Sequence, residues 1–237
     1  MPRLLTLMGS GETAPTMVST HREVVARFGP TPPRAVLLDT PYGFQENAAE
    51  ITQRAVEYFD HRVQLAIEAA GFLGPLAVDP GQHTPLAETA ALSRLRTADL
   101  IFAGPGSPSY ALSVWRSSLV PETLASKITQ GGAVVFASAA ALTLGRYSVP
   151  VYEIYKVGQA IHWLDGLDLL GAIGFPGACA VIPHFDNAEA APTTRASAIS
   201  ASGGSRPWRR SCPKTAGCWA STSTPRSSSI STLARSA

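Results

Sequence analysis

Short apolar runs alternate with longer amphipathic stretches along more than half of this chain. Apolar runs bounded by Gly and Pro are typical of buried strands, and they occur at 4–8, 34–40, 63–69, 100–103 and 133–137. Apolar residues that recur every three or four positions are typical of helices, and they occur at 16–28, 47–59, 85–98 and 119–130. This alternation predicts an α/β fold in which a parallel sheet is flanked by helices on both faces.

The composition is that of a globular protein. A chain of 237 residues, 45% apolar and 15% charged, is long enough to bury the core of one domain. No apolar run approaches the ~18 residues that a membrane span needs, and Met1–Gly9 lacks the apolar length and cleavage site of a signal peptide. We therefore expect a cytoplasmic protein with no membrane partner. Three cysteines without zinc-type spacing indicate neither a disulfide framework nor a metal site.

Charge divides the chain at Glu189. Residues 1–189 hold 12 Lys and Arg against 17 Asp and Glu, a net charge of −5, whereas residues 190–237 hold 7 basic residues and no acid, a net charge of +7. The segment 190–237 is rich in Ser, Thr, Arg and Pro and has no hydrophobic periodicity, so it is expected to be disordered. A basic tail is also typical of nucleic-acid binding, which predicts a salt-sensitive affinity that deletion of 190–237 abolishes.

We favour a frameshift as the origin of this tail, and hence no nucleic-acid partner. Moving GC-rich codons for Cys218–Pro225 by one nucleotide gives Val-Leu-Gly-Val-Asp-Glu-His-Thr, and the same shift from Ala190 gives acids, a helix-like segment and a β-branched strand. The hypothesis divides the chain into a domain at 1–189 and an altered tail at 190–237. Sequencing the gene around codon 189 tests it, and an intact frame there contradicts it.

Ser138 is the main candidate for chemistry. It follows the apolar run 133–137 and is surrounded by small residues, as in a nucleophile elbow, where a strained strand-to-helix turn exposes a serine hydroxyl at the carboxyl edge of a sheet. The simpler interpretation is a small residue that packs after a buried strand. A nucleophilic serine needs a histidine to take its proton and usually a carboxylate to orient that histidine.

His184 and Glu153 supply these two residue types downstream. His184 follows the β-branched run at 180–182, so it is expected at the same sheet edge as Ser138. A loop histidine bonded to the backbone is the alternative. Glu153 could equally be a solvated residue that pairs with Lys156.

A glycine-containing loop, Gly104-Pro-Gly106-Ser-Pro-Ser, follows the apolar run 100–103. Its backbone N–H groups could hold a developing oxyanion. Phosphate binding is the weaker alternative, because the chain has no Walker lysine and no complete dinucleotide fingerprint. We therefore expect no cofactor.

These motifs resemble the serine peptidase family that includes aspartyl dipeptidase and cyanophycinase. Phe136-Ala-Ser-Ala-Ala-Ala is similar to its strand followed by Ser-Ala-Gly-Ala, Ile182-Pro-His-Phe to its histidine motif, and Ile101-Phe-Ala-Gly-Pro-Gly to its glycine-rich loop. The resemblance covers roughly residues 4–189. It implies the flavodoxin-like, three-layer fold of class I glutamine amidotransferases.

The resemblance also implies roles for particular residues. Ser138 would be the nucleophile, His184 the base and Glu153 the orienting acid, with the backbone N–H groups of Gly106 and Ala139 as oxyanion donors. The chain departs from the family at Ala140, where the family has glycine, and in lacking the Gly-Gly-Asn/Thr form of the loop. Amidotransferases carry a cysteine at the elbow, so Ser138 argues against glutamine hydrolysis of that kind.

Together these features predict a serine peptidase or amide hydrolase that acts on a short peptide or a related small substrate, without metal or cofactor. A homodimer is one assembly state left open. The alternative from a different class is a non-catalytic, amidotransferase-like module that binds a small metabolite or a protein partner.

Overall fold

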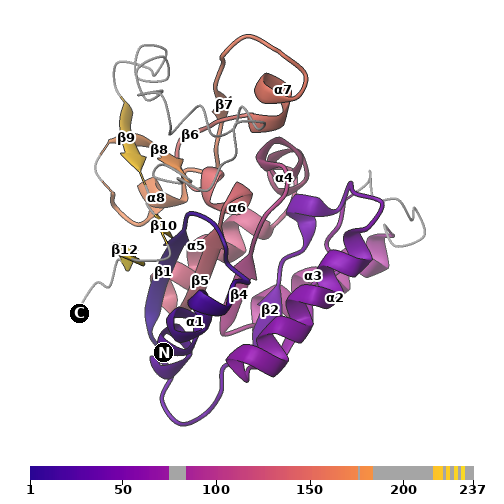
Figure 1. The fold of residues 1–237 in the computed structure, drawn as a ribbon, viewed down its shortest axis with the longest axis vertical. Coiled ribbons are helices and arrows are strands. Elements are labelled where there is room, and N and C mark those ends of the chain that lie inside the picture. Colours follow the sequence, from indigo (N-terminus) through magenta and orange to yellow (C-terminus); the bar gives the residue numbers. More distant parts are fainter. Residues whose placement is uncertain are drawn as a thin grey trace.

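A six-stranded sheet in the order β12-β1-β5-β4-β2-β3 lies at the centre of the molecule (Figure 1). The computed structural model describes residues 1–74, 84–175 and 177–183, and the backbone of strand segments 216–220, 223–224, 227–228 and 231–232. Five strands run parallel: β1 (Arg3–Met8), β2 (Ala35–Leu37), β3 (Ile67–Ala69), β4 (Leu100–Ala103) and β5 (Gly132–Ala137). The sixth, β12 (Ser231–Thr232), pairs antiparallel with β1.

Helices cover both faces of this sheet. One face packs against α3 (Pro85–Thr97), α4 (Pro108–Trp115), α5 (Val120–Gln130), α6 (Ala139–Leu142) and α8 (Leu169–Ala172). The other packs against η1 (Pro15–Met17), α1 (Val18–Ala26), α2 (Ala48–Tyr58) and η3 (Phe59–Val63). The predicted three-layer α/β fold with a parallel sheet is therefore confirmed.

A second, smaller sheet has the order β7-β6-β8-β9. Its strands are β6 (Tyr147–Ser148), β7 (Leu164–Asp165), β8 (Ala178–Ile182) and β9 (Ala216–Ala220), and a separate pair joins β10 (Ser223–Thr224) to β11 (Ser227–Ser228). The short helix α7 (Val151–Tyr155) packs against this smaller sheet. Its Ile154 belongs to a buried cluster that also contains Val149 and Ile182. The expected disorder of 190–237 stays a prediction, since most of that segment lies outside the described residues.

The central strand β5 shows why an uninterrupted apolar run forms a strand here. Its alternate residues point to opposite faces: Val134 and Phe136 enter the cluster under α3–α5, and Val135 and Ala137 enter the cluster under α1 and α2. Every residue of β5 is buried. A strand covered on both faces has no solvent-facing positions, so no polar residue interrupts the run.

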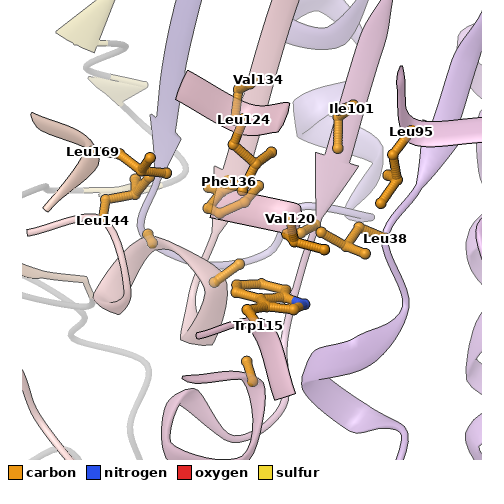
Figure 2. Packing of buried hydrophobic residues seen from close by; sticks show 14 of the residues in the cluster. Leu38, Leu95, Ile101, Trp115, Val120, Leu124, Val134, Phe136, Leu144 and Leu169 are labelled. Carbon is orange, nitrogen blue, oxygen red and sulfur yellow. The ribbon is translucent and has the colours of Figure 1, made fainter. Parts of the chain in front are cut away.

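Trp115 anchors the larger of the two clusters. Its ring lies next to Val120 and Phe136 (Figure 2), with the Trp115 and Phe136 ring centroids 5.8 Å apart. The residue is fully buried at the end of α4. The helix α4 directly follows the Gly104–Ser107 loop. The packing of Trp115 therefore holds the carboxyl-terminal end of that loop near the core through α4.

Three predicted elements differ from the structure. The run 63–69 is shorter as a strand, because Val63 ends the π-helical turn η3 and Gln64 has a left-handed φ of 64°. The run 34–40 is a strand only to Leu37, and the chain then enters η2 (Thr40–Tyr42). The loop after β4 ends earlier than expected, because α4 begins at Pro108.

Asp39 joins the ends of β2 and β3. Its carboxylate oxygens accept hydrogen bonds from the Gly71 and Phe72 N–H groups at 3.3 and 3.1 Å, and the neighbouring Thr40 hydroxyl donates to the Phe72 carbonyl. Asp39 is 2% exposed. Burial raises the pKa of Asp39 to about 6, against the opposing effect of the N–H groups and of Arg94.

Asp39→Asn is expected to remove a pH dependence of stability. Between pH 4 and 6 the unfolded carboxyl loses its proton while the folded one keeps it, so this group lowers the free energy of unfolding as the pH rises, by about 3 kcal/mol in all. Urea unfolding from pH 4 to 7 measures the slope in wild type, in Asp39→Asn and in Asp60→Asn, an exposed control. Equal slopes in wild type and Asp39→Asn contradict the expectation.

Candidate active site

Ser138 occupies a strained turn between β5 and α6. Its φ of 51° and ψ of −117° lie in a region that residues with a side chain rarely adopt, at a cost of about 1–3 kcal/mol. The Ser138 N–H donates to the Met8 carbonyl at 3.1 Å. The turn therefore has the backbone conformation that the elbow motif predicts, although the role of the hydroxyl stays a prediction.

The ends of β1 and β4 flank this turn. In the sheet Ala137 pairs with Met8, and Phe136 pairs with Ala103. One further hydrogen bond, from the Ala140 N–H to the Gly104 carbonyl at 3.3 Å, joins α6 to the loop after β4. The glycine-containing loop and the turn of Ser138 are thus brought to one edge of the sheet.

Gly106 fits where no other residue would. Its φ is 137°, and a Cβ atom there would lie 2.1 Å from the Pro41 carbonyl oxygen, which also accepts the Ser107 N–H at 2.7 Å. Within the described residues, the N–H groups of Gly106 and Ala139 donate no hydrogen bond. Two N–H groups that have no acceptor among the described residues could bind an anionic oxygen. The assignment of Gly106 and Ala139 as oxyanion donors stays a prediction.

Ala140, where the resemblance leads one to expect glycine, is fully buried in the cluster that also holds Trp115 and Phe136. Its methyl group contributes to the packing between α6 and the sheet. The departure is therefore accommodated by the core.

Glu153 lies on α7 and accepts a hydrogen bond from the Ser109 hydroxyl on α4 at 2.8 Å. Lys156, the partner that the sequence suggested, instead places its ammonium 4.1 Å from the centre of the Tyr152 ring. Both α4 and α7 lie toward the same end of the molecule (Figure 1). Glu153 is thus held by a neutral hydroxyl, and among the described residues no Lys, Arg or His side chain forms an ion pair with it.

His184 lies outside the described residues. The described segment that precedes it ends at Pro183, directly after β8, a strand whose Ile182 packs with Ile154 of α7. The contacts of His184 with Ser138 and Glu153 therefore stay predictions.

Aromatic side chains from three segments gather beside Glu153. Phe44 follows η2 and is 37% exposed, and its ring centroid lies 5.2 Å from that of Tyr110 and 6.3 Å from that of Tyr152. Tyr110 is held by a hydrogen bond from its hydroxyl to the Leu73 carbonyl at 2.6 Å. No sequence pattern singles out Phe44, because the three rings meet only in the fold.

Glu12 and His21 form a second buried polar group near this edge. The Glu12 side chain is 7% exposed and His21 is 3% exposed, and the His21 Nε2–H donates to the Glu12 carbonyl at 2.7 Å. Neither residue belongs to a motif that the sequence displays. A carboxyl four residues beyond the apolar run that ends at Met8 was the available signal for Glu12.

Other kinds of site are less well supported. In the ranges that the structure describes, no three His, Cys, Asp or Glu side chains gather in a way that could hold a metal ion. An open depression lies at the opposite, amino ends of β2, β3 and β4, lined by residues that include Pro33, Ile67 and Asp99. No described helix combines the length and the apolar character needed to cross a membrane.

Comparisons with known proteins bear on the fold. No protein-family model matches the sequence, and no curated protein matches it. The solved structure of a peptidase from an acI-B1 Actinobacterium is 18% identical, with a TM-score of 0.59 over 79% of this chain and 70% of that one. A peptidase E candidate from Listeria monocytogenes EGD-e is 13% identical, with a TM-score of 0.59 over the whole of both chains. The protein therefore shares its three-layer fold with two structures that are named peptidases.

Proposed function

We propose that this protein is a serine-type peptidase or amide hydrolase that acts on a short peptide or a related small substrate. The observation that carries the proposal is the conformation of Ser138. A residue with a side chain is held at a φ of 51° where β5 meets α6, next to the loop that contains Gly106. Strain of this kind persists only where the surrounding structure enforces it, and it is concentrated at functional sites.

The proposed reaction begins with attack of the Ser138 hydroxyl oxygen on the substrate carbonyl carbon. His184 takes the hydroxyl proton, and the carbonyl oxygen becomes an oxyanion. Collapse of this intermediate breaks the amide bond, and His184 gives its proton to the leaving amine. A water molecule then hydrolyses the ester on Ser138 by the same two steps, which releases the acid and restores the enzyme.

Three further groups support these steps. The Gly106 and Ala139 N–H groups donate to the oxyanion, at the point where negative charge develops. Glu153 orients His184 and stabilises its protonated form, and the hydrogen bond from Ser109 holds the Glu153 carboxylate in place. The aromatic side chains of Phe44, Tyr110 and Tyr152 border this region.

A fluorophosphonate probe tests the proposal, because it reacts with activated serines. We expect the folded, full-length protein to be labelled, and the labelling to disappear in Ser138→Ala. Ser117→Ala, which removes an exposed hydroxyl from the segment after α4, is the matched control and should label like wild type. If sequencing reveals a missing or extra base near codon 189, the same comparison is made in the restored frame.

A folded protein that the probe does not label in either frame contradicts the proposal. That result favours the second candidate, a non-catalytic module that binds a small metabolite or a protein partner. The strained turn at Ser138 would then serve packing alone, and Ser138→Ala would leave ligand binding unchanged.

A further inference from the structure

Glu12 is a buried carboxyl that the proposed reaction does not use. It follows β1 in the turn Gly9-Ser-Gly-Glu and is 7% exposed. Its carboxyl oxygens accept a hydrogen bond from its own backbone N–H, and in the part of the chain that the structure describes no Lys, Arg or His side chain pairs with them. Burying a carboxyl without a cationic partner costs free energy of folding. A functional role for Glu12 would account for a carboxyl at this position.

The Glu12 side chain crosses the edge of the sheet at which Ser138 lies. In the strand order, β5 is between β1 and β4. Glu12 follows β1, yet its Oε1 atom lies 3.6 Å from the position that a Cβ atom on Gly104, at the end of β4, would take. Its carboxyl therefore reaches past the end of β5 to the loop that contains Gly106.

The turn that carries Glu12 is fixed from two helices. The buried His21 on α1 donates to the Glu12 carbonyl at 2.7 Å, and the Tyr58 hydroxyl on α2 donates to the Ala14 carbonyl at 3.0 Å. The His21 ring is itself enclosed by aromatic rings, with centroid distances of 4.8 Å to Phe59 and 5.7 Å to Phe102. Glu12 is thus held against the loop and has little freedom to turn toward solvent.

The groups that face Glu12 leave it without a compensating charge. Burial raises the pKa of Glu12, and its own N–H opposes this only in part. Burial lowers the pKa of His21, and the pKa of Tyr58 is raised to about 12 by burial and by the Glu12 charge. Neither His21 nor Tyr58 therefore offers a positive charge that would offset the effect of burial on Glu12.

We infer that Glu12 is a positioning residue for the proposed hydrolysis. As a neutral carboxyl, it supports the Gly104–Gly106 loop in the geometry that binds the oxyanion. Once ionised, it places a negative charge against the loop that donates to the oxyanion, and like charges in a buried site repel strongly. The inference rests on the proposed function of Ser138, and it adds a pH limit to that function.

The test compares pH profiles of hydrolysis in wild type, Glu12→Gln and Glu12→Ala. With a chromogenic short-peptide amide, wild-type kcat should rise with pH as His184 loses its proton and fall again as Glu12 ionises. Glu12→Gln keeps a neutral group of the same shape, so the alkaline fall should vanish while the maximal kcat stays within about threefold of wild type. Glu12→Ala removes the support, and kcat should drop by about tenfold or more at every pH, with a smaller change in KM.

Glu23→Gln makes the same exchange at an exposed position of α1 and should leave the profile unchanged. An alkaline fall that persists in Glu12→Gln, or a wild type that has none, overturns the role of Glu12. Should Glu12→Ala not fold, the isosteric Glu12→Gln still decides, because its effect is on the pH profile. A wild type that fluorophosphonate does not label at any pH instead refutes the proposed function, and the role of Glu12 falls with it.

Discussion

Replacing Ser138 with glycine is expected to stabilise the fold and to abolish hydrolysis. The residue has a φ of 51° and a ψ of −117°, a conformation that glycine adopts without the steric cost that a Cβ atom imposes. Removing the Cβ atom relieves this cost, and removing the hydroxyl eliminates the proposed nucleophile. Stability and activity should therefore change in opposite directions at one position.

Ser138→Ala is the control that separates the two effects, since it lacks the hydroxyl but keeps the Cβ atom. Both variants should lose hydrolysis by at least about a thousandfold. Urea unfolding should give Ser138→Gly a free energy of unfolding about 1 kcal/mol or more above that of Ser138→Ala, even though glycine gains more entropy on unfolding. If Ser138→Gly is the less stable of the two, the backbone strain is not what distinguishes this site.

Gly106→Ala is expected to damage both the fold and the proposed reaction. The added Cβ atom would lie 2.1 Å from the Pro41 carbonyl oxygen, well inside contact distance, and the φ of 137° is itself unfavourable for alanine. The atoms nearest to the added Cβ belong to the backbone of Pro41 and Tyr42, which cannot turn away as a side chain could. The loop must therefore move, and the hydrogen bond from the Ser107 N–H to the Pro41 carbonyl is strained or lost. We expect a loss of about 3 kcal/mol or more in stability.

Gly29→Ala is a matched control, because Gly29 also has a positive φ, of 82°, but nothing lies within 4 Å of the Cβ position. It should cost only about 1 kcal/mol. Displacing the Gly106 N–H by about 1 Å should also lower kcat by about a hundredfold, whereas Gly29→Ala should leave kcat unchanged. Equal unfolding free energies and equal kcat values in the two variants would show that the loop can relax around the added methyl group.

The main layers of this fold were predictable from the sequence, because strands that are buried on both faces appear as uninterrupted apolar runs. Residues 100–103 and 133–137 are apolar on both faces of the sheet. In the helix at 119–130, buried residues recur every three or four positions. The helix α4 was hidden by the Ser-Pro-Ser sequence, which is typical of a turn. The same residues supply a helix start, since Ser107 caps α4 through the Tyr110 N–H and Pro108 occupies its first position.

The site was predictable only as far as it depends on local backbone. The turn at Ser138 follows from a buried strand and small neighbours, and the structure places it at the expected strand end. The hydrogen bond between Ser109 and Glu153 joins residues 44 positions apart, and the reach of Glu12 toward Gly104 depends on the strand order. Neither contact produces a periodic pattern or a fixed spacing in the sequence, so neither could be predicted before the fold was known.

The pairing of β1 with β5 has a consequence for how the protein is made. Strand β1 is synthesised first, but its parallel partner follows only after roughly 120 further residues. At the usual rates of translation, the apolar residues 4–8 wait on the order of ten seconds before β5 can cover them. The nascent chain therefore carries an apolar strand without its parallel partner over this interval, and we expect protection of that segment to raise the yield of folded protein.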